Sequence, residues 1–204
     1  QMRWRPKVDN WLEIIHATLF PGGCLLCGDP AHDDLDLCAP CQHELPFNRP
    51  ACQRCGRPLP KRAPLCGACL RRPPPYHALT AALRYTAPVA RLVHGLKFHH
   101  RLENARLLGR LLGDAVADRV APPPEFILPV PLHPIRLRRR GFNQALELAR
   151  PLATRLGIPI ARGYCRRRRA TEEQTRLPAK GRRANVRGAF EVVRPIPARS
   201  VALV

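Results

Sequence analysis

Four CxxC pairs constrain the fold of this chain more than any other feature. They are Cys24/Cys27, Cys38/Cys41, Cys52/Cys55 and Cys66/Cys69, with ten residues in every gap between neighbouring pairs. Both sulfurs of a CxxC turn can reach one ion at about 2.3 Å, and tetrahedral Zn²⁺ needs two such turns to fill its coordination shell. The eight cysteines therefore predict two closed Zn²⁺ sites. A closed site has no position for water, so both ions should be structural rather than catalytic.

The pairing of these turns has two candidate arrangements. The first and third turns continue similarly, as Cys27-Gly28-Asp29-Pro30 and Cys55-Gly56-Arg57-Pro58, which indicates one ribbon unit used twice. A repeated unit favours sequential ligation, with the cysteines of residues 24–41 around one ion and those of residues 52–69 around the other. A cross-braced arrangement is the alternative. His32 and His43 lie nearby, but four thiolates already satisfy each ion, so we expect both histidines at the surface.

Composition indicates a folded protein of a reducing compartment. The 204 residues are 45% apolar, which is enough for a genuine core. No stretch approaches the roughly 20 apolar residues that span a bilayer, and residues 11–20 are too short and too acidic at their start for a signal peptide. CxxC pairs without a signal sequence favour metal thiolates over disulfides. We therefore expect a cytoplasmic protein that does not insert into membranes.

Positive charge is concentrated beyond the cysteines. The formal net charge is +20; residues 1–70 contain 8 basic and 7 acidic side chains, whereas residues 71–204 contain 27 and 8. Each Zn²⁺ held by four thiolates nets about −2, so metallation makes the first part more negative. A strongly basic region favours a polyanionic partner, either nucleic acid or a phosphate ligand. A bias toward Arg codons, with 31 Arg against 4 Lys, is the alternative explanation.

The chain divides into four consecutive parts. We expect an N-terminal helix in residues 1–22, a double zinc ribbon in 23–70, a stiff proline-rich linker in 71–76 and an α/β domain in 77–204. Apolar periodicity predicts helices over residues 89–96, 107–116 and 143–156, and apolar runs predict strands at 79–85, 126–131, 158–160, 189–193 and 201–204. Strands that alternate with helices favour a largely parallel sheet. Because the last strand looks buried and stops in mid-course, we expect the sequence to be a fragment.

Two basic segments are the candidate binding regions. They are residues 133–144 and 166–187, and between Arg136 and Arg187 there are 16 basic and 3 acidic residues. The first segment lies between a predicted strand and a predicted helix, where an open α/β sheet binds ligands and a helix N-terminus favours anions. We therefore expect phosphate binding there. A solvated arginine face is the alternative, and it fits residues 166–169 best because that run shows no pattern.

Motifs in the basic part resemble the ComF family of competence proteins. They are Leu128-Pro129-Val130-Pro131-Leu132-His133-Pro134, Arg140-Gly141-Phe142-Asn143-Gln144, and Ala170-Thr171 with Gln174, Leu177, Arg182, Asn185 and Ala189-Phe190. The double ribbon ahead of these motifs adds to the likeness, which covers roughly residues 20–204. The resemblance implies a type I phosphoribosyltransferase-like domain behind the ribbon. It also implies a role in handling single-stranded DNA during natural transformation.

The resemblance further implies where a ligand binds. The loop after the first core strand contacts pyrophosphate in the parent fold, which points to Arg138, Arg140 and Gln144. A mobile loop that covers the active site matches residues 168–187. Its candidates to neutralise pyrophosphate, as that group leaves an oxocarbenium-like ribose, are Gln174, Lys180 and Arg182.

Other positions relate to the family less directly. Asn185 is expected to fix the end of the mobile loop, and Lys97 matches a family lysine, although a helix-end lysine without a ligand is the plainer interpretation. Arg176 and Gly181 depart from the family, which implies a small and an acidic residue at these positions. The acidic pair and the Thr-Thr-Gly loop that hold the ribose and its 5′-phosphate are expected beyond Val204.

Two functions fit these observations. One is a ComF-type transferase acting in DNA uptake or nucleotide salvage, with phosphoribosyl pyrophosphate and Mg²⁺ as ligands and single-stranded DNA or the DNA-uptake machinery as a partner. The other is a non-catalytic single-stranded nucleic-acid-binding protein that uses a degenerate transferase fold and an arginine-rich face. An aromatic content of only 5% weakens base stacking in the second, but not phosphate binding. Neither the catalytic residues nor the acceptor substrate is indicated.

Overall fold

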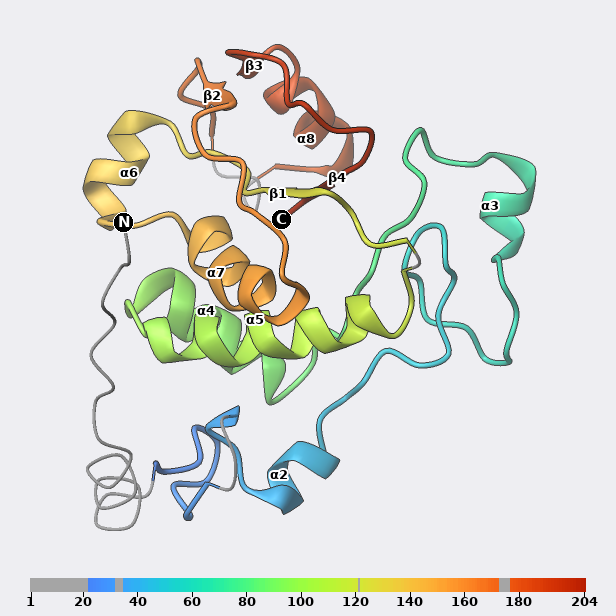
Figure 1. Cartoon of the computed structure of the whole chain (residues 1–204), viewed down its shortest axis with the longest axis vertical. Helices are drawn as coiled ribbons and strands as arrows, with labels where there is room; N and C mark the ends of the chain where they lie inside the picture. Colours follow the sequence, from blue (N-terminus) through green and yellow to red (C-terminus); the bar gives the residue numbers. More distant parts are fainter. Residues whose placement is uncertain (1–21, 32–34, 121, 173–176) are drawn as a thin grey trace, which may run out of the picture.

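A computed structural model of the chain describes residues 22–31, 35–120, 122–172 and 177–204 (Figure 1). The expected N-terminal helix lies outside these residues. The helices are α2 (Ala39–His43), α3 (Gly67–Arg71), α4 (Val89–Phe98), α5 (Leu102–Ala117), α6 (Pro134–Arg140), α7 (Gln144–Leu156) and α8 (Ala179–Val186). The strands are β1 (Phe126–Leu128), β2 (Cys165–Arg167), β3 (Phe190–Val192) and β4 (Val201–Leu203). Within the described residues, no helix is long and apolar enough to cross a membrane.

The strands form two small groups. β1 and β4 pair in parallel, with Ile127 opposite Ala202, and a single parallel bridge from Ile127 to Ile160 extends this sheet on its other side. β2 and β3 form a separate antiparallel pair. The prediction of an α/β chain with parallel strands is therefore confirmed, whereas the β2–β3 pair shows that part of the strand structure is antiparallel.

Helices α5 and α7 hold the central core together. α7 lies between β1 and α5 (Figure 1), and the side chains of Ile127 and Ala149 are completely buried between these elements. Gly109 lets the two helices approach closely, because a Cβ atom there would lie 2.5 Å from the carbonyl oxygen of Leu148. A larger residue at this position would force α5 and α7 apart.

The helices predicted from apolar periodicity are confirmed, and their ends follow from local sequence. Asn143 caps α7 by accepting a 3.1 Å hydrogen bond from the Ala145 amide, and Gly157 ends it in the left-handed region at φ 68°. Helix α6 was not predicted, because its sequence has no apolar stripe and none of its side chains is buried. Its ends were nevertheless marked by Pro134 at the first helical position and by Gly141, which has φ 78°.

Two strand predictions were wrong, and a third was wrong about burial. Residues 79–85 form no strand: among the described residues, their long-range backbone hydrogen bonds go only to residues 46–48, around one isolated bridge between Phe47 and Leu83. Residues 158–160 touch the sheet at a single bridge, since Pro159 has no N–H to donate. β4 forms as predicted, but Leu203 is 69% exposed rather than buried.

Candidate metal centres and a basic cavity

The eight paired cysteines form two quartets. Within each quartet the four Sγ atoms lie within 4.8 Å of one another: one contains Cys24, Cys27, Cys38 and Cys41, and the other Cys52, Cys55, Cys66 and Cys69. Four sulfurs at about 2.3 Å from one tetrahedral ion would be about 3.8 Å apart. The Sγ atoms of Cys27 and Cys38 are 3.5 Å apart and those of Cys55 and Cys66 are 3.7 Å apart. The donor set thus fits two structural Zn²⁺ ions in the sequential arrangement, and the cross-braced alternative is wrong.

Each quartet is built from the same backbone turn. Gly28 donates its amide to the Cys24 carbonyl at 2.9 Å, and Gly56 donates to the Cys52 carbonyl at the same distance. Both glycines have positive φ, at 88° and 68°. The second half of each quartet opens a short helix, α2 or α3. This repetition confirms the repeated ribbon unit predicted from the sequence. His43 is exposed and belongs to neither quartet, and His32 lies outside the described residues.

Within each quartet the thiols differ in acidity. Burial opposes ionisation of Cys24, but hydrogen bonds from the backbone of Cys38 and Cys27 outweigh it and lower the pKa of Cys24 to about 6. The equivalent Cys52 behaves in the same way, with a pKa of about 6. Burial and the neighbouring Cys55 thiol raise the pKa of Cys69 to about 12. A hydrogen bond from the Cys69 backbone also lowers the pKa of Cys66. Each quartet therefore contains at least one thiol of lowered pKa, and a Zn²⁺ ion would displace the protons that the other thiols retain.

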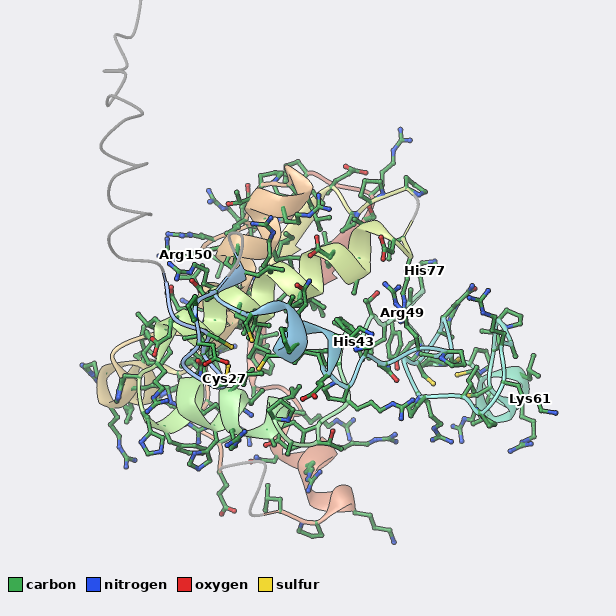
Figure 2. The ribbon with its side chains drawn as sticks, turned by 90° about the horizontal axis from the view of Figure 1, so that it is seen from below. Cys27, His43, Arg49, Lys61, His77 and Arg150 are labelled. Atoms are coloured by element: carbon green, nitrogen blue, oxygen red, sulfur yellow. The ribbon has the colours of Figure 1, made fainter. Side chains whose placement is uncertain are left out.

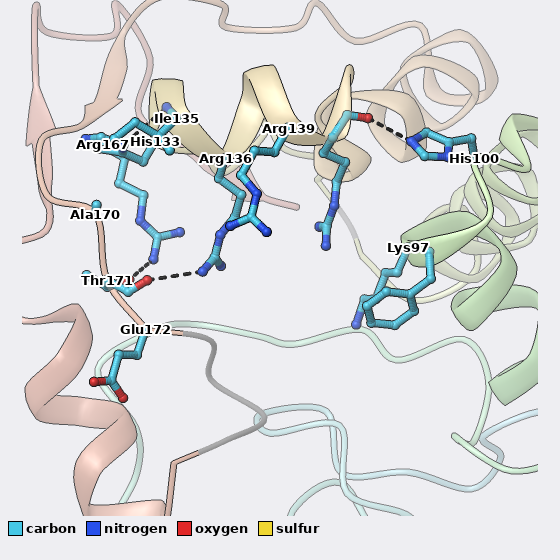
Figure 3. Close-up of a pocket in the computed structure, with 12 residues that line it drawn as sticks. Lys97, His100, His133, Ile135, Arg136, Arg139, Arg167, Ala170, Thr171 and Glu172 are labelled. Carbon is cyan, nitrogen blue, oxygen red and sulfur yellow. Dashed lines mark hydrogen bonds between the residues drawn. The ribbon is translucent and has the colours of Figure 1, made fainter.

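A basic cavity of about 770 Å³ lies between α4, α6 and the segment that follows β2 (Figure 3). Its lining comprises Lys97, Phe98, His100, His133, Ile135, Arg136, Arg139, Arg140, Arg167, Ala170, Thr171 and Glu172. Lys and Arg supply five of these side chains, and Glu172 is the one carboxylate among them. The motifs that resemble the ComF family thus meet in space, since His133, Arg140 and Ala170-Thr171 all line this cavity.

Two arginines are fixed side by side on one wall of the cavity. Arg136 donates a 3.1 Å hydrogen bond to the Thr171 carbonyl, and Arg167 donates to the Thr171 hydroxyl (Figure 3). The Nε atom of Arg167 is buried and has no hydrogen-bond partner among the described residues. Burial and the neighbouring charge of Arg136 lower the pKa of Arg167. An anion bound here would relieve the repulsion between the two guanidinium groups and could accept the unused N–H.

The end of α4 forms the opposite wall. The His100 ring nitrogen Nε2 lies 3.1 Å from the Arg140 carbonyl oxygen, which joins the ends of α4 and α6. The Arg140 guanidinium lies 6.0 Å from the centroid of the Phe98 ring, and Phe98 is 53% exposed. Lys97 lines the cavity beside them. Its position therefore favours the ligand-facing interpretation over that of an ordinary helix-end lysine.

The predicted pyrophosphate residues are not all brought together. Arg140 lines the cavity, whereas Arg138 is exposed on α6, and Lys180 and Arg182 lie on α8, outside the cavity lining. Gln144 is 8% exposed at the start of α7, and its Nε2 atom has no hydrogen-bond partner among the described residues. Gln174 falls outside the described residues. The ligand roles of all six residues stay predictions.

Arg136, Arg139 and Arg167 were not singled out from the sequence. The run of residues 166–169 shows no pattern as a sequence, but the extended backbone of β2 and the residue after it points successive side chains to opposite sides. Arg166 and Arg168 contact Glu191 at 2.6 and 3.5 Å, whereas Arg167 lines the cavity. The period-two alternation of a strand could have revealed this. Asn185 donates a 3.0 Å hydrogen bond to the Glu172 carbonyl. Its role in fixing the end of the loop stays a prediction.

Comparison with known proteins places these features in a family. The double zinc ribbon domain family matches residues 15–70. The DNA utilization protein YhgH of Salmonella typhi is 38% identical over 187 residues, covering 90% of this chain and 76% of that protein. YhgH of Escherichia coli K12 is 36% identical over 90% of this chain and 83% of that protein. Competence protein F of Haemophilus influenzae is 36% identical over 66% of this chain and 62% of that protein. No solved structure matches the chain. The chain belongs to the ComF family, together with these competence and DNA utilization proteins.

Proposed function

We propose that this protein is a phosphoribosyltransferase-like member of the ComF family that acts in the use of DNA, and that its basic cavity binds phosphoribosyl pyrophosphate. The names of the relatives, DNA utilization protein and competence protein F, support the DNA-related role. The resemblance of the motifs that line the cavity supports the ligand. We also propose a cytoplasmic location, and the division into the ribbon (23–70), linker (71–76) and transferase-like domain (77–204).

The observation that carries this proposal is the convergence of cations in the cavity. Lys97 comes from α4, three arginines come from α6 and Arg167 comes from β2, so side chains far apart in the sequence meet around one space. Five positive side chains face one carboxylate, Glu172. Guanidinium groups bind phosphate oxygens through paired hydrogen bonds, and a pyrophosphate offers oxygens on two phosphorus atoms. A ligand with adjacent phosphates therefore matches the cavity better than a single carboxylate would.

The fixed arginines suit a reaction in which pyrophosphate leaves. Thr171 holds Arg136 and Arg167 in place through its carbonyl and hydroxyl groups. Donors that are already oriented stabilise developing charge without reorganising during the reaction. In this proposal Arg136 and Arg167 bind the leaving oxygens, and Lys97 and Arg140 neutralise charge from the opposite wall.

Mg²⁺ belongs to this proposal as a companion of the ligand. Glu172 is the one carboxylate that lines the cavity, so the described lining residues do not form a complete Mg²⁺ site by themselves. Mg²⁺ prefers six oxygen ligands and keeps several waters, and it commonly binds through substrate phosphates. The ion would therefore enter with the pyrophosphate and reduce the repulsion among its oxygens.

Calorimetry on the zinc-loaded full chain tests the proposal. Phosphoribosyl pyrophosphate with Mg²⁺ should bind, and Arg136→Ala should weaken binding about 10- to 100-fold, because a hydrogen bond to a charged group contributes about 1.5–3 kcal/mol. Arg91→Ala is the matched control, since Arg91 is an exposed arginine of α4 that does not line the cavity. Absence of binding at about 1 mM ligand, which corresponds to about −4 kcal/mol, would exclude the proposed ligand.

A further inference from the structure

The second ribbon, defined here as residues 52–72, is uniformly basic. It contains six cationic side chains and no acidic one: Arg54, Arg57, Lys61, Arg62, Arg71 and Arg72. The absence of acidic residues extends over the whole sequence from residue 45 to residue 102. Even after a Zn²⁺ ion with four thiolates contributes about −2, the second ribbon keeps a net charge of about +4.

These cations are available to a partner. All of them except Arg54 are exposed, and Arg54 donates a 3.0 Å hydrogen bond to the carbonyl of Pro74. Among the described residues, no ion pair joins any of the six to a carboxylate. Figure 2 shows the second ribbon, which includes α3, extending away from the central helices, with Lys61 at its outer end. The charge of the five exposed cations is therefore neither buried nor neutralised by a carboxylate of the described residues.

Folding of the second ribbon does not require this charge. Its buried cluster consists of Cys52, Cys66 and Cys69, with Cys55, Leu59 and Leu65 packed against them. The six cations lie outside this cluster, and their mutual repulsion opposes the compact state. A surface that bears only positive charges therefore lowers the free energy of unfolding of the ribbon, and a bound anionic partner would offset this loss.

The surface also offers apolar and aromatic contacts. Leu70 is 68% exposed beside Arg71, and Tyr76 is 41% exposed four residues after Arg72. The hydrogen bond from Arg54 to Pro74 holds the segment before Tyr76 against the ribbon. Bases of single strands stack on exposed aromatic rings while cations bind the phosphates. Five of the six cations are arginines, whose planar fork matches phosphate oxygens.

We propose that the second ribbon is a binding surface for single-stranded nucleic acid. Arg57, Lys61, Arg62, Arg71 and Arg72 contact the phosphate backbone, and the Tyr76 ring stacks on a base. We expect binding to be independent of base sequence, because the surface contacts phosphates through cations and bases through an aromatic ring, without base-specific hydrogen bonds. None of its residues lines the basic cavity, so the two sites bind independently.

The test is the salt dependence of binding by the zinc-loaded full chain. The probe is an oligothymidylate of about 20 nucleotides, longer than the roughly 4–16 nucleotides that one small domain covers. Between about 50 and 200 mM salt, the logarithm of the association constant should fall linearly with the logarithm of the salt concentration, by about 0.7 per phosphate contact. The double variant Lys61→Ala/Arg62→Ala should flatten this slope by about 1.4, and Arg71→Ala/Arg72→Ala should do the same.

Two further variants separate charge from stacking and from folding. Tyr76→Leu should weaken binding about 5-fold or more without changing the salt slope, because it removes a ring but no charge. Arg91 is an exposed arginine outside the ribbon, and Arg91→Ala should change the slope by less than about 0.5. Metal analysis of every variant should still find about two Zn²⁺ per chain, which shows that the ribbons remain folded.

The outcomes distinguish this proposal from that of the cavity. An unchanged slope in both double variants would overturn the nucleic-acid surface, as would equally tight, equally variant-sensitive binding of polyglutamate, which would indicate an acidic protein partner. Binding of phosphoribosyl pyrophosphate should be the same in the ribbon variants and in the unmodified chain. Loss of oligothymidylate binding in Arg136→Ala instead, with the ribbon variants unaffected, would assign nucleic acid to the cavity and overturn the ribbon proposal.

Discussion

The two zinc ribbons share one cysteine spacing but differ in almost everything around it. Residues 22–45, the first ribbon, contain five acidic side chains and no Lys or Arg, whereas the second ribbon has six basic side chains and no acidic one. Cys24, Leu37 and Cys38 of the first ribbon belong to the same core cluster as Leu92 and Leu107 of the helices. The second ribbon has only its own small cluster around three buried cysteines.

This difference shows that an identical metal-ligand pattern can serve two structural purposes. Two ligands of the first Zn²⁺ site, Cys24 and Cys38, belong to the main core, so we expect an ion there to stabilise α4 and α5 as well as the ribbon. The second site stabilises a projecting unit that leaves its surface to partners. The charges follow the same division: Asp36 of the first ribbon forms an ion pair with Arg106 of α5 at 2.6 Å, whereas the cations of the second ribbon have no carboxylate partner among the described residues.

The largest predicted effect is loss of a ligand from the first site. Cys38→Ser should remove one of about two Zn²⁺ ions and lower the stability of the helical core by about 3 kcal/mol or more, because structural zinc supplies folding free energy and Cys38 is 5% exposed in the shared cluster. Metal analysis and thermal unfolding followed by helical circular dichroism measure both effects. A melting temperature equal to that of the unmodified chain would show that the first ribbon is not part of the core.

The matched change in the second site should act only locally. Cys66→Ser should also remove one Zn²⁺ ion, but helical unfolding should shift by only a few degrees, since Cys66 packs with cysteines and leucines of its own ribbon. Hydrogen exchange should accelerate in residues 52–72 and stay slow in α5 and α7. If Cys66→Ser lowers the melting temperature as much as Cys38→Ser does, the contrast between the two ribbons is wrong.

The shared core makes a prediction from the helix side. Leu107 of α5 is 1% exposed and packs in the cluster that contains Cys24 and Cys38. Leu107→Ala should cost about 2–5 kcal/mol and should also speed release of one Zn²⁺ ion to a chelator. Leu59→Ala, which lies against the second cluster, should speed release of the other ion with less effect on helical unfolding. Chelator-competition kinetics in both variants tell the two ions apart.

Sequence reasoning succeeded where local spacing decides the structure. The four CxxC pairs specify the zinc quartets because each turn is closed by its own few residues, and α4, α5 and α7 carry apolar stripes that show their buried faces. It failed where the structure depends on distant partners. Residues 79–85 have strand-like composition but meet no neighbouring strand, and α6 has no buried face from which periodicity could have identified it.

The candidate site was predicted in location but not in composition. The sequence indicated the two basic segments, yet Arg167 reaches the cavity only because β2 alternates its side chains, and Lys97 only because α4 ends beside α6. The net charge of residues 1–70 also concealed the difference in charge between the two ribbons. The 8 basic and 7 acidic side chains of residues 1–70 nearly cancel, although the acidic ones of the ribbons lie only in the first and the basic ones only in the second.

The smallest predicted effect concerns the ion pair that joins the first ribbon to α5. Asp36 has φ 54°, a left-handed conformation that asparagine also tolerates, so Asp36→Asn removes the charge without straining the backbone. Because Arg106 is largely exposed, the pair should contribute less than about 1 kcal/mol. A double-mutant cycle with Arg106→Gln, measured by denaturant unfolding at low and high salt, isolates this contribution. A coupling energy that is the same in high salt would show that the pair is more shielded from solvent than its exposure indicates. The ion pair would then add to the apolar packing that holds the first ribbon against α5.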